Sequence, residues 1–209
     1  MVKTKIKDPE LIKKKQRQIC RGALKVFRTK GFHAASIREI ATASGISLGS
    51  LYDYIEKKED ILFLVHKEVL DQVYHRLDET FEKYKNTVDQ LTNLVRELVN
   101  LTCRLKDEML FIYTETKSLD KEYQTQVLHR ESEFVGAIEA LIKRGVKEGL
   151  FDCPNPDIMA NIIAFTGAII PLRGWNFLPR HSEDEMIEAL VNLISKGLDM
   201  RTIPQPSRP

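Results

Sequence analysis

Residues 36–55 read SIREIATASGISLGSLYDYI, and this stretch decides the fold. Two short helical patterns are separated by a break at Gly45, a residue type that adopts left-handed backbone angles at little cost. Ser36, with Glu39 three residues later, makes a capping box for the first helix, and Ser47 caps the second helix. Two short helices joined by such a tight turn are typical of a helix-turn-helix.

The outer face of the second helix is the part that meets DNA in this geometry. The recognition helix of a helix-turn-helix lies in the major groove, with its front residues at base edges and nearby phosphates. Charged side chains and free N–H groups at the start of the following helix also favour a phosphate. The residues expected to contact DNA are Ser36, Ser47, Leu48, Gly49, Ser50, Tyr52, Tyr54, Lys57 and Lys58.

The rest of the chain also has helical periodicity and no convincing strand pattern, which predicts an all-α protein. A first long helix ends at Gly31, and the third helix of the head spans about 48–54. The later helices are expected over 58–83, 91–105, 109–117, 121–148, 158–171 and 183–200. The head is therefore a three-helix domain of residues 1–58, followed by a helical domain of residues 59–203 and a disordered tail of residues 204–209.

The charge is distributed unevenly between these parts. Residues 1–58 contain 14 Lys and Arg against 5 Asp and Glu, a net charge of +9, whereas residues 59–209 contain 18 against 25, a net charge of −7. A basic head on an acidic body indicates that the head alone meets a polyanion. A lysine-rich, solvated N-terminus would produce the same count.

Several functional classes lack support in the sequence. We see no apolar run of the roughly 18–20 residues that a membrane span needs, so we expect a cytoplasmic protein without membrane contact. Cys20, Cys103 and Cys153 are far apart and match no zinc spacing, which favours reduced, buried thiols. The sequence contains no Gly-rich phosphate loop, HExxH, GxSxG or repeated Glu-x-x-His. We therefore expect neither an enzyme nor a cofactor.

The stretch from residue 18 to residue 65 resembles the DNA-binding region of the TetR family of repressors. Residues 23–62, ALKVFRTKGFHAASIREIATASGISLGSLYDYIEKKEDIL, follow the family pattern nearly throughout. Asp53 departs from it by placing an anion near the expected phosphate surface, and Ile55 stands where an aromatic residue is usual. The resemblance implies about nine helices and a homodimer on a palindromic operator, because two heads grip two half-sites.

The resemblance also implies that the last two helices form the dimer interface. The helix from Ile158 to Pro171 is almost wholly apolar, and a helix that is apolar all round must be buried. A partner chain would bury it, although burial inside one chain remains the alternative. The expected interface residues are Ile158, Ile162, Ile169, Met186, Leu190, Val191 and Ile194.

Shorter stretches (residues 113–123, 130–134 and 171–177) resemble the branch of the family that responds to acyl-CoA thioesters. That resemblance implies a repressor of fatty-acid or related lipid metabolism genes that releases DNA when the thioester binds. An acyl chain needs an apolar tunnel, and the CoA group needs cationic and stacking groups at its mouth. The expected ligand-binding residues are Phe111, Tyr113, Phe134, Phe165, Arg173 and Trp175.

Three alternatives stay open. A TetR-type repressor of an efflux system would respond to a lipophilic drug and would carry acidic groups in its pocket. A DNA-binding protein without a ligand would have a well-packed body. A helical enzyme is the remaining class. In the repressor, bound effector is expected to shift the population of protein toward a state in which the long helix that starts at Lys58 has moved. That movement changes the separation or angle of the two heads.

Overall fold

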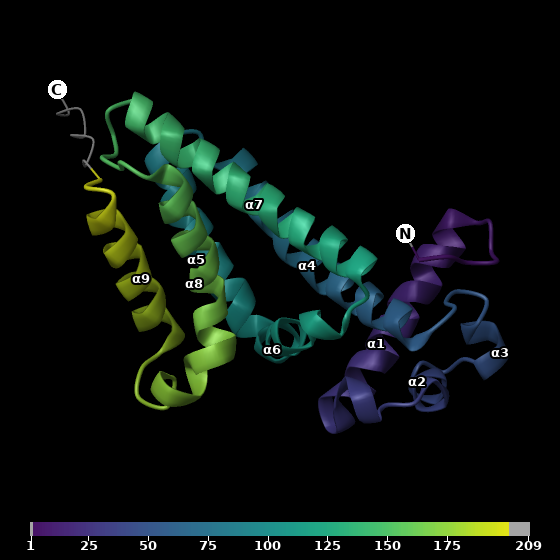
Figure 1. Cartoon of the computed structure of the whole chain (residues 1–209). Coiled ribbons are helices and arrows are strands. Elements are labelled where there is room, and N and C mark those ends of the chain that lie inside the picture. Colours follow the sequence, from purple (N-terminus) through teal and green to yellow (C-terminus); the bar gives the residue numbers. More distant parts are fainter. Residues whose placement is uncertain (1, 201–209) are drawn as a thin grey trace. The chain divides into compact units, whose positions relative to one another are not determined.

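The structure, a computed structural model, describes residues 2–200. Within that range the chain forms helices and no strand, which confirms the predicted all-α class (Figure 1). The elements are α1 (Pro9–Ala34), α2 (Ile37–Ala43), α3 (Leu48–Leu51), α4 (Lys58–Lys83), α5 (Thr87–Arg104), α6 (Lys106–Glu115), the 3-10 turn η1 (Thr116–Ser118), α7 (Lys121–Lys147), α8 (Pro156–Phe177) and α9 (Glu183–Gly197). The tail predicted at residues 204–209 lies outside the described residues.

The chain divides into two compact units. Unit 1 contains residues up to 72 together with residues 107–128, and unit 2 contains residues 73–106 together with the described residues from 129 onward. The helix-turn-helix head therefore shares a unit with most of α6 and with the first turns of α7. The helices α4 and α7 each contribute residues to both units.

The local signals in the head set most of the helix boundaries. Ser36 and Glu39 form the predicted capping box, and the predicted break at Gly31 is a non-helical residue (φ 74°) inside α1. The third helix is shorter than predicted, because it ends at Leu51 rather than near residue 54. Tyr52 takes the cap position, where its N–H bonds back to carbonyls within α3.

The core of unit 1 depends on a close contact between α1 and α2. Ile19, Ile40 and Leu51 are completely buried. At Gly22, a Cβ atom would lie 2.6 Å from the Ser44 backbone nitrogen and 2.8 Å from its Cα. Only glycine allows α1 to approach the end of α2 this closely. The local sequence pattern does not distinguish Gly22 from other helical residues.

In unit 2, α8 and α9 both pack on α5. The largest fully buried side chains of this unit come from α4, α5, α7 and α8: Leu77, Leu91, Leu94, Ile138, Ile142 and Ile163. Ser182 and Glu185 form a capping box at the start of α9. By contrast, the Asn155 side chain makes no capping hydrogen bond at α8, where Pro156 occupies the first turn.

The helix α8 corrects one expectation from the sequence. Its 22 residues are long and apolar enough to cross a membrane by length and composition, and half of the apolar window is buried inside the protein. The core helix of a soluble protein also has these properties, and α8 packs on α5. The helix alone is therefore weak evidence for a membrane span.

The three cysteines are free and buried, as expected. Burial raises the pKa of the Cys20 thiol to about 12 and the pKa of the Cys103 thiol to about 11. Thiols with such pKa values carry almost no thiolate at neutral pH and react slowly.

The contact at Gly22 leads to a test of the fold. Gly22→Ala should lower the free energy of unfolding by about 2 kcal/mol, because the new methyl group meets backbone atoms that cannot move aside. Gly136→Ala on α7 is the matched control, since nothing lies within 4 Å of its Cβ position. That variant should be unchanged or slightly stabilised. Equal stability of the Gly22 variant and the wild type in urea unfolding would contradict the packing described.

Candidate nucleic-acid interface

The turn between α2 and α3 has the geometry of a helix-turn-helix. Gly45 has a φ of 65°, and the Ile46 N–H closes the turn on the Ala41 carbonyl at 3.1 Å. The Ser47 hydroxyl then accepts from the Ser50 N–H at 3.1 Å and caps α3. The Gln18 amide of α1 donates to the Ser44 carbonyl at 2.7 Å, which fixes the turn on the rest of the head.

Most of the residues predicted to contact DNA lie together on the outer side of α3. Ser47 and Gly49 are exposed, and Leu48 and Ser50 are half-buried. The Tyr52 side chain is 39% exposed at the end of the helix. The side chains of Ser47, Gly49 and Ser50 are small, so another molecule can approach the backbone of α3 closely. Ser36 is also exposed, but its hydroxyl is engaged in the capping box of α2.

Tyr54 is the first of the expected contacts that the structure places elsewhere. Its side chain is 4% exposed and belongs to the core of the head. It lies between the buried residues Leu51 and Ile55 in sequence, and the turns after α3 direct all three side chains inward. A buried ring cannot lie on the DNA surface, so we remove Tyr54 from the interface.

Lys58 also has a different role from the one expected. Its ammonium group donates to the carbonyls of Phe32, His33 and Ala35 at 3.0, 3.1 and 3.1 Å, and it lies 4.6 Å from the centroid of the Phe32 ring. A lysine has three N–H donors, and all three are used on the segment that joins α1 to α2. Lys58 therefore fastens the head together and has no donor left for a phosphate.

The N-terminal end of α4 is likewise occupied from inside the protein. The buried Asp60 carboxylate accepts from the N–H groups of Glu56 and Lys57 at 2.7 and 3.0 Å. The exposed Lys57 ammonium is paired with Asp120, and that hydrogen bond raises the pKa of Lys57. The N–H groups of Glu56 and Lys57, just before α4, are therefore not available to a phosphate, although the Lys57 side chain stays on the surface.

Contacts within unit 1 tie the head to α6 and to the start of α7. The Tyr123 hydroxyl donates to Asp60 at 2.7 Å, and Tyr123 stacks on Phe63 with ring centroids 4.2 Å apart. The rings of Phe27 and Phe111 stack at 5.1 Å. These contacts could not be predicted from the sequence, because nothing in the local pattern of one helix identifies a partner 60 or more residues away.

A buried imidazole adds a further link between α4 and α6. The ring nitrogens of His66 lie 2.9 Å from the Leu62 carbonyl and 3.2 Å from the Ile112 carbonyl. Burial lowers the pKa of His66, which favours the neutral ring. A neutral ring has only one N–H to donate, so it satisfies one of the two carbonyls.

The residues predicted to bind the effector are distributed over both units. Phe111 and Tyr113 belong to unit 1, whereas Phe134 belongs to unit 2, where its ring lies 5.2 Å from that of Tyr74. Phe165 is 64% exposed, and so it lines no enclosed pocket. Arg173 and Trp175 are both exposed, with the guanidinium 5.6 Å from the centroid of the indole ring.

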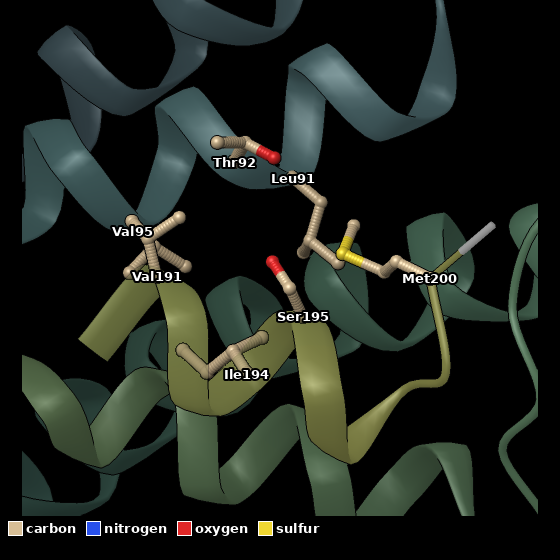
Figure 2. Close-up of a pocket in the computed structure, with 7 residues that line it drawn as sticks. All are labelled: Leu91, Thr92, Val95, Val191, Ile194, Ser195 and Met200. Carbon is tan, nitrogen blue, oxygen red and sulfur yellow. The ribbon is translucent and has the colours of Figure 1, made fainter. Parts of the chain in front are cut away.

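A small hollow lies between α5 and α9 in unit 2 (Figure 2). Its volume of about 150 Å³, part of which is open to solvent, is below the roughly 300 Å³ of a typical small-molecule site. It is lined by Leu91, Thr92, Val95, Val191, Ile194, Ser195 and Met200. The hollow is too small for the predicted effector.

The seven expected dimer residues differ in burial and fall into three groups. Leu190 and Ile194 of α9 are buried, and Val191 and Ile194 line the hollow against α5, so these three face the interior of unit 2. Ile158 and Ile162 of α8 are more than half exposed. The remaining two, Ile169 and Met186, are half-buried.

Both halves of the chain match known protein families. Residues 19–65 match the family model of the bacterial regulatory proteins of the tetR family, and residues 84–198 match the tetracyclin repressor-like C-terminal domain. The HTH-type transcriptional regulator HbdR of Aromatoleum sp. (strain CIB) is 28% identical over 187 residues, which cover 90% of this chain and 82% of that protein.

The names of two further similar proteins mention fatty acid metabolism or an acyl-CoA. The fatty acid metabolism regulator protein of Bacillus subtilis (strain 168) is 35% identical over 63 residues, 30% of this chain and 32% of that protein. The crystal structure of AibR in complex with isovaleryl coenzyme A and operator DNA is similar, with a TM-score of 0.73 and 22% identity over 86% of this chain and 97% of that chain. At this identity the structural similarity supports the fold alone.

The hydrogen bonds of Lys58 lead to a test of whether this lysine stabilises the fold or binds DNA. Lys58→Met should lower the free energy of unfolding by about 2 kcal/mol, because three carbonyls lose a charged donor. Lys57→Met is the neighbouring control, and it should leave the unfolding curve nearly unchanged, since its ion pair is exposed. A Lys58 variant that keeps full stability but loses DNA affinity would restore the phosphate role.

Proposed function

The chain belongs to the TetR family of bacterial regulatory proteins, and from that premise we propose a specific function. It is a transcriptional repressor whose operator binding is relieved by a small hydrophobic effector, an acyl-CoA thioester, and which controls fatty-acid or related lipid metabolism genes. The single observation that carries the DNA-binding part is the capped α2–α3 turn, with small exposed residues on the outer side of α3. Because the family is one of regulators, we assign no enzymatic activity.

The operator contacts follow from the part of α3 that remains exposed. Ser47, Gly49 and Ser50 permit close approach to the groove, and the Tyr52 hydroxyl is able to bond a phosphate while its ring packs on sugar. Lys57 adds a cation at the edge of this surface. The net charge of +9 on residues 1–58 supports the same assignment.

The choice of effector class rests on the relatives and on a few side chains. AibR binds isovaleryl coenzyme A, and the Bacillus subtilis relative is named for fatty acid metabolism. In this chain, Arg173 beside Trp175 provides a cation and a stacking face that suit the charged, adenine-bearing end of a CoA thioester. The half-buried Phe134 is a candidate for contact with the acyl chain.

The contacts within unit 1 suggest how binding reaches the head. An effector that displaces α6 or the first turns of α7 strains the Phe27–Phe111 stack and the Asp60–Tyr123 hydrogen bond. Both contacts connect directly to helices of the head or to the start of α4. The effector releases DNA only if it binds the DNA-incompetent arrangement more tightly than the competent one.

A homodimer is part of the proposal, and the exposed face of α8 supports it. The apolar side chains Ile158, Ile162, Phe165, Ile169 and Leu172 recur at spacings of four and three residues, which is the pattern of a helix–helix seam. Four of these five are exposed and Ile169 is half-buried. Leu193 on α9 is exposed as well. Phe165 is therefore reassigned from the effector site to the dimer face.

The function is tested by operator release. Fluorescence anisotropy with DNA from upstream of the chain's own gene should show tight binding that acyl-CoA thioesters, isovaleryl-CoA among them, weaken at low concentration. The matching free acids and free CoA should have little effect, because the site reads both halves of the molecule. Release by lipophilic cationic drugs instead would indicate the efflux-type repressor. Tight binding that nothing releases would discard the acyl-CoA effector and keep the DNA-binding role.

The dimer is tested by introducing a charge on the apolar face of α8. Ile162→Glu should give a monomer by light scattering coupled to gel filtration, because an unpaired carboxylate is costly to bury in an interface. Operator affinity should fall at least about tenfold as the two-site binding is lost. Leu128→Glu on α7 is the control, since that leucine is similarly exposed. A dimeric Ile162 variant, or a monomeric Leu128 variant, would contradict this assignment.

A further inference from the structure

Residues 2–7, VKTKIK, form a non-helical arm before α1 with an alternating pattern of exposure. Val2 is 5% exposed, and Thr4 and Ile6 are half-buried. The intervening lysines 3, 5 and 7 are all exposed. The arm therefore has an inner side that packs on the head and an outer side of three lysines.

Hydrogen bonds fasten the inner side of the arm next to the recognition helix. The Thr4 hydroxyl and the Lys5 N–H both donate to the Asp53 carbonyl, at 2.8 and 2.9 Å. The Thr4 hydroxyl also accepts from the Ile6 N–H at 3.1 Å. Asp53 directly follows Tyr52, the last exposed residue of the α3 surface. The arm is thus held at the C-terminal edge of the surface proposed to contact DNA.

The charges at this edge fit a polyanion. Asp53 and Glu56 place two carboxylates beside α3, and Lys3 pairs with Glu56 at 3.8 Å. That ion pair is largely exposed, so it is weak and exchanges easily. Within the described residues 2–200, the ammonium groups of Lys5 and Lys7 make no hydrogen bond or ion pair. The arm therefore leaves the edge with a net positive charge despite the two acidic residues.

We propose that residues 2–7 are a second DNA-binding element, which binds backbone phosphates flanking the bases that α3 reads. The proposal rests on the proposed repressor function and extends its DNA surface. A merely solvated lysine-rich tail would not need a buried Val2 or a threonine fastened to the Asp53 carbonyl. The arm explains how the head accommodates Asp53 at its DNA-facing edge, because the adjacent lysines compensate its charge.

The test compares variants by the salt dependence of operator binding. Each lysine–phosphate contact contributes about 0.9 to the slope of log affinity against log salt. The triple variant Lys3→Gln, Lys5→Gln, Lys7→Gln removes three such cations per chain. In a dimer the slope should therefore fall by up to about 5 between roughly 50 and 200 mM salt. A control with the same change of charge replaces the exposed Lys83, Lys147 and Lys196 of unit 2 by Gln.

A second pair of variants tests the hydrogen bond from the Thr4 hydroxyl to the Asp53 carbonyl rather than the charge of the arm. Thr4→Val keeps all three lysines but removes the hydroxyl that holds the arm, so operator affinity should fall about three- to tenfold. Thr4→Ser keeps the hydroxyl and should bind as the wild type does.

The outcomes separate this proposal from the repressor function. A triple arm variant with the slope and affinity of the wild type would overturn the arm's role while leaving the repressor intact. An equal decrease of the salt slope in the unit 2 control would also overturn the arm's role, because the net charge of the protein would then explain the effect. A wild type that prefers no operator over random DNA refutes the repressor function, and the salt slopes on random DNA still decide the arm. A wild type that binds no DNA overturns both.

Discussion

The buried carboxylate of Asp60 is the interaction on which the arrangement of the head depends. It is 2% exposed, and it accepts hydrogen bonds from two backbone N–H groups at the start of α4 and from the Tyr123 hydroxyl of α7. A buried carboxylate without these partners is unstable, so the two helix starts have to stay together. Burial and the bond to Asp60 raise the pKa of Tyr123, which keeps its hydroxyl a donor.

This hydrogen-bonded carboxylate holds together helices that belong to the same compact unit as the head. The helix-turn-helix, most of α6 and the first turns of α7 belong to one unit, and Lys58 fastens the α1–α2 junction from the first position of α4. We expect a head built in this way to respond as a rigid body when α6 or α7 shifts, because interfaces in packed cores change between discrete arrangements. For a regulator in the proposed class, that is the property which turns effector binding into loss of DNA.

The sequence predicted the fold class and the recognition turn, because Gly45, Ser36 and Glu39 act through neighbours along the chain. The sequence did not predict contacts between residues that are far apart along the chain. A lysine at the start of a helix suits a phosphate or three carbonyls equally, and only the fold placed Lys58 beside the carbonyls. Apolar residues of α9 were expected in the dimer interface, but an apolar pattern does not say what covers it, and Leu190 and Ile194 face the interior of unit 2. The small size of Gly22 likewise has a meaning only once α2 lies against α1.

The central claim is that operator and effector bind alternative arrangements of one protein, and thermodynamic linkage tests it most directly. Calorimetry would measure the affinity for isovaleryl-CoA with the free protein and with the operator complex. The account predicts that the operator weakens thioester binding by the same factor by which the thioester weakens operator binding. Thioester binding of equal strength in both states would contradict the account, because a ligand without differential affinity shifts no equilibrium.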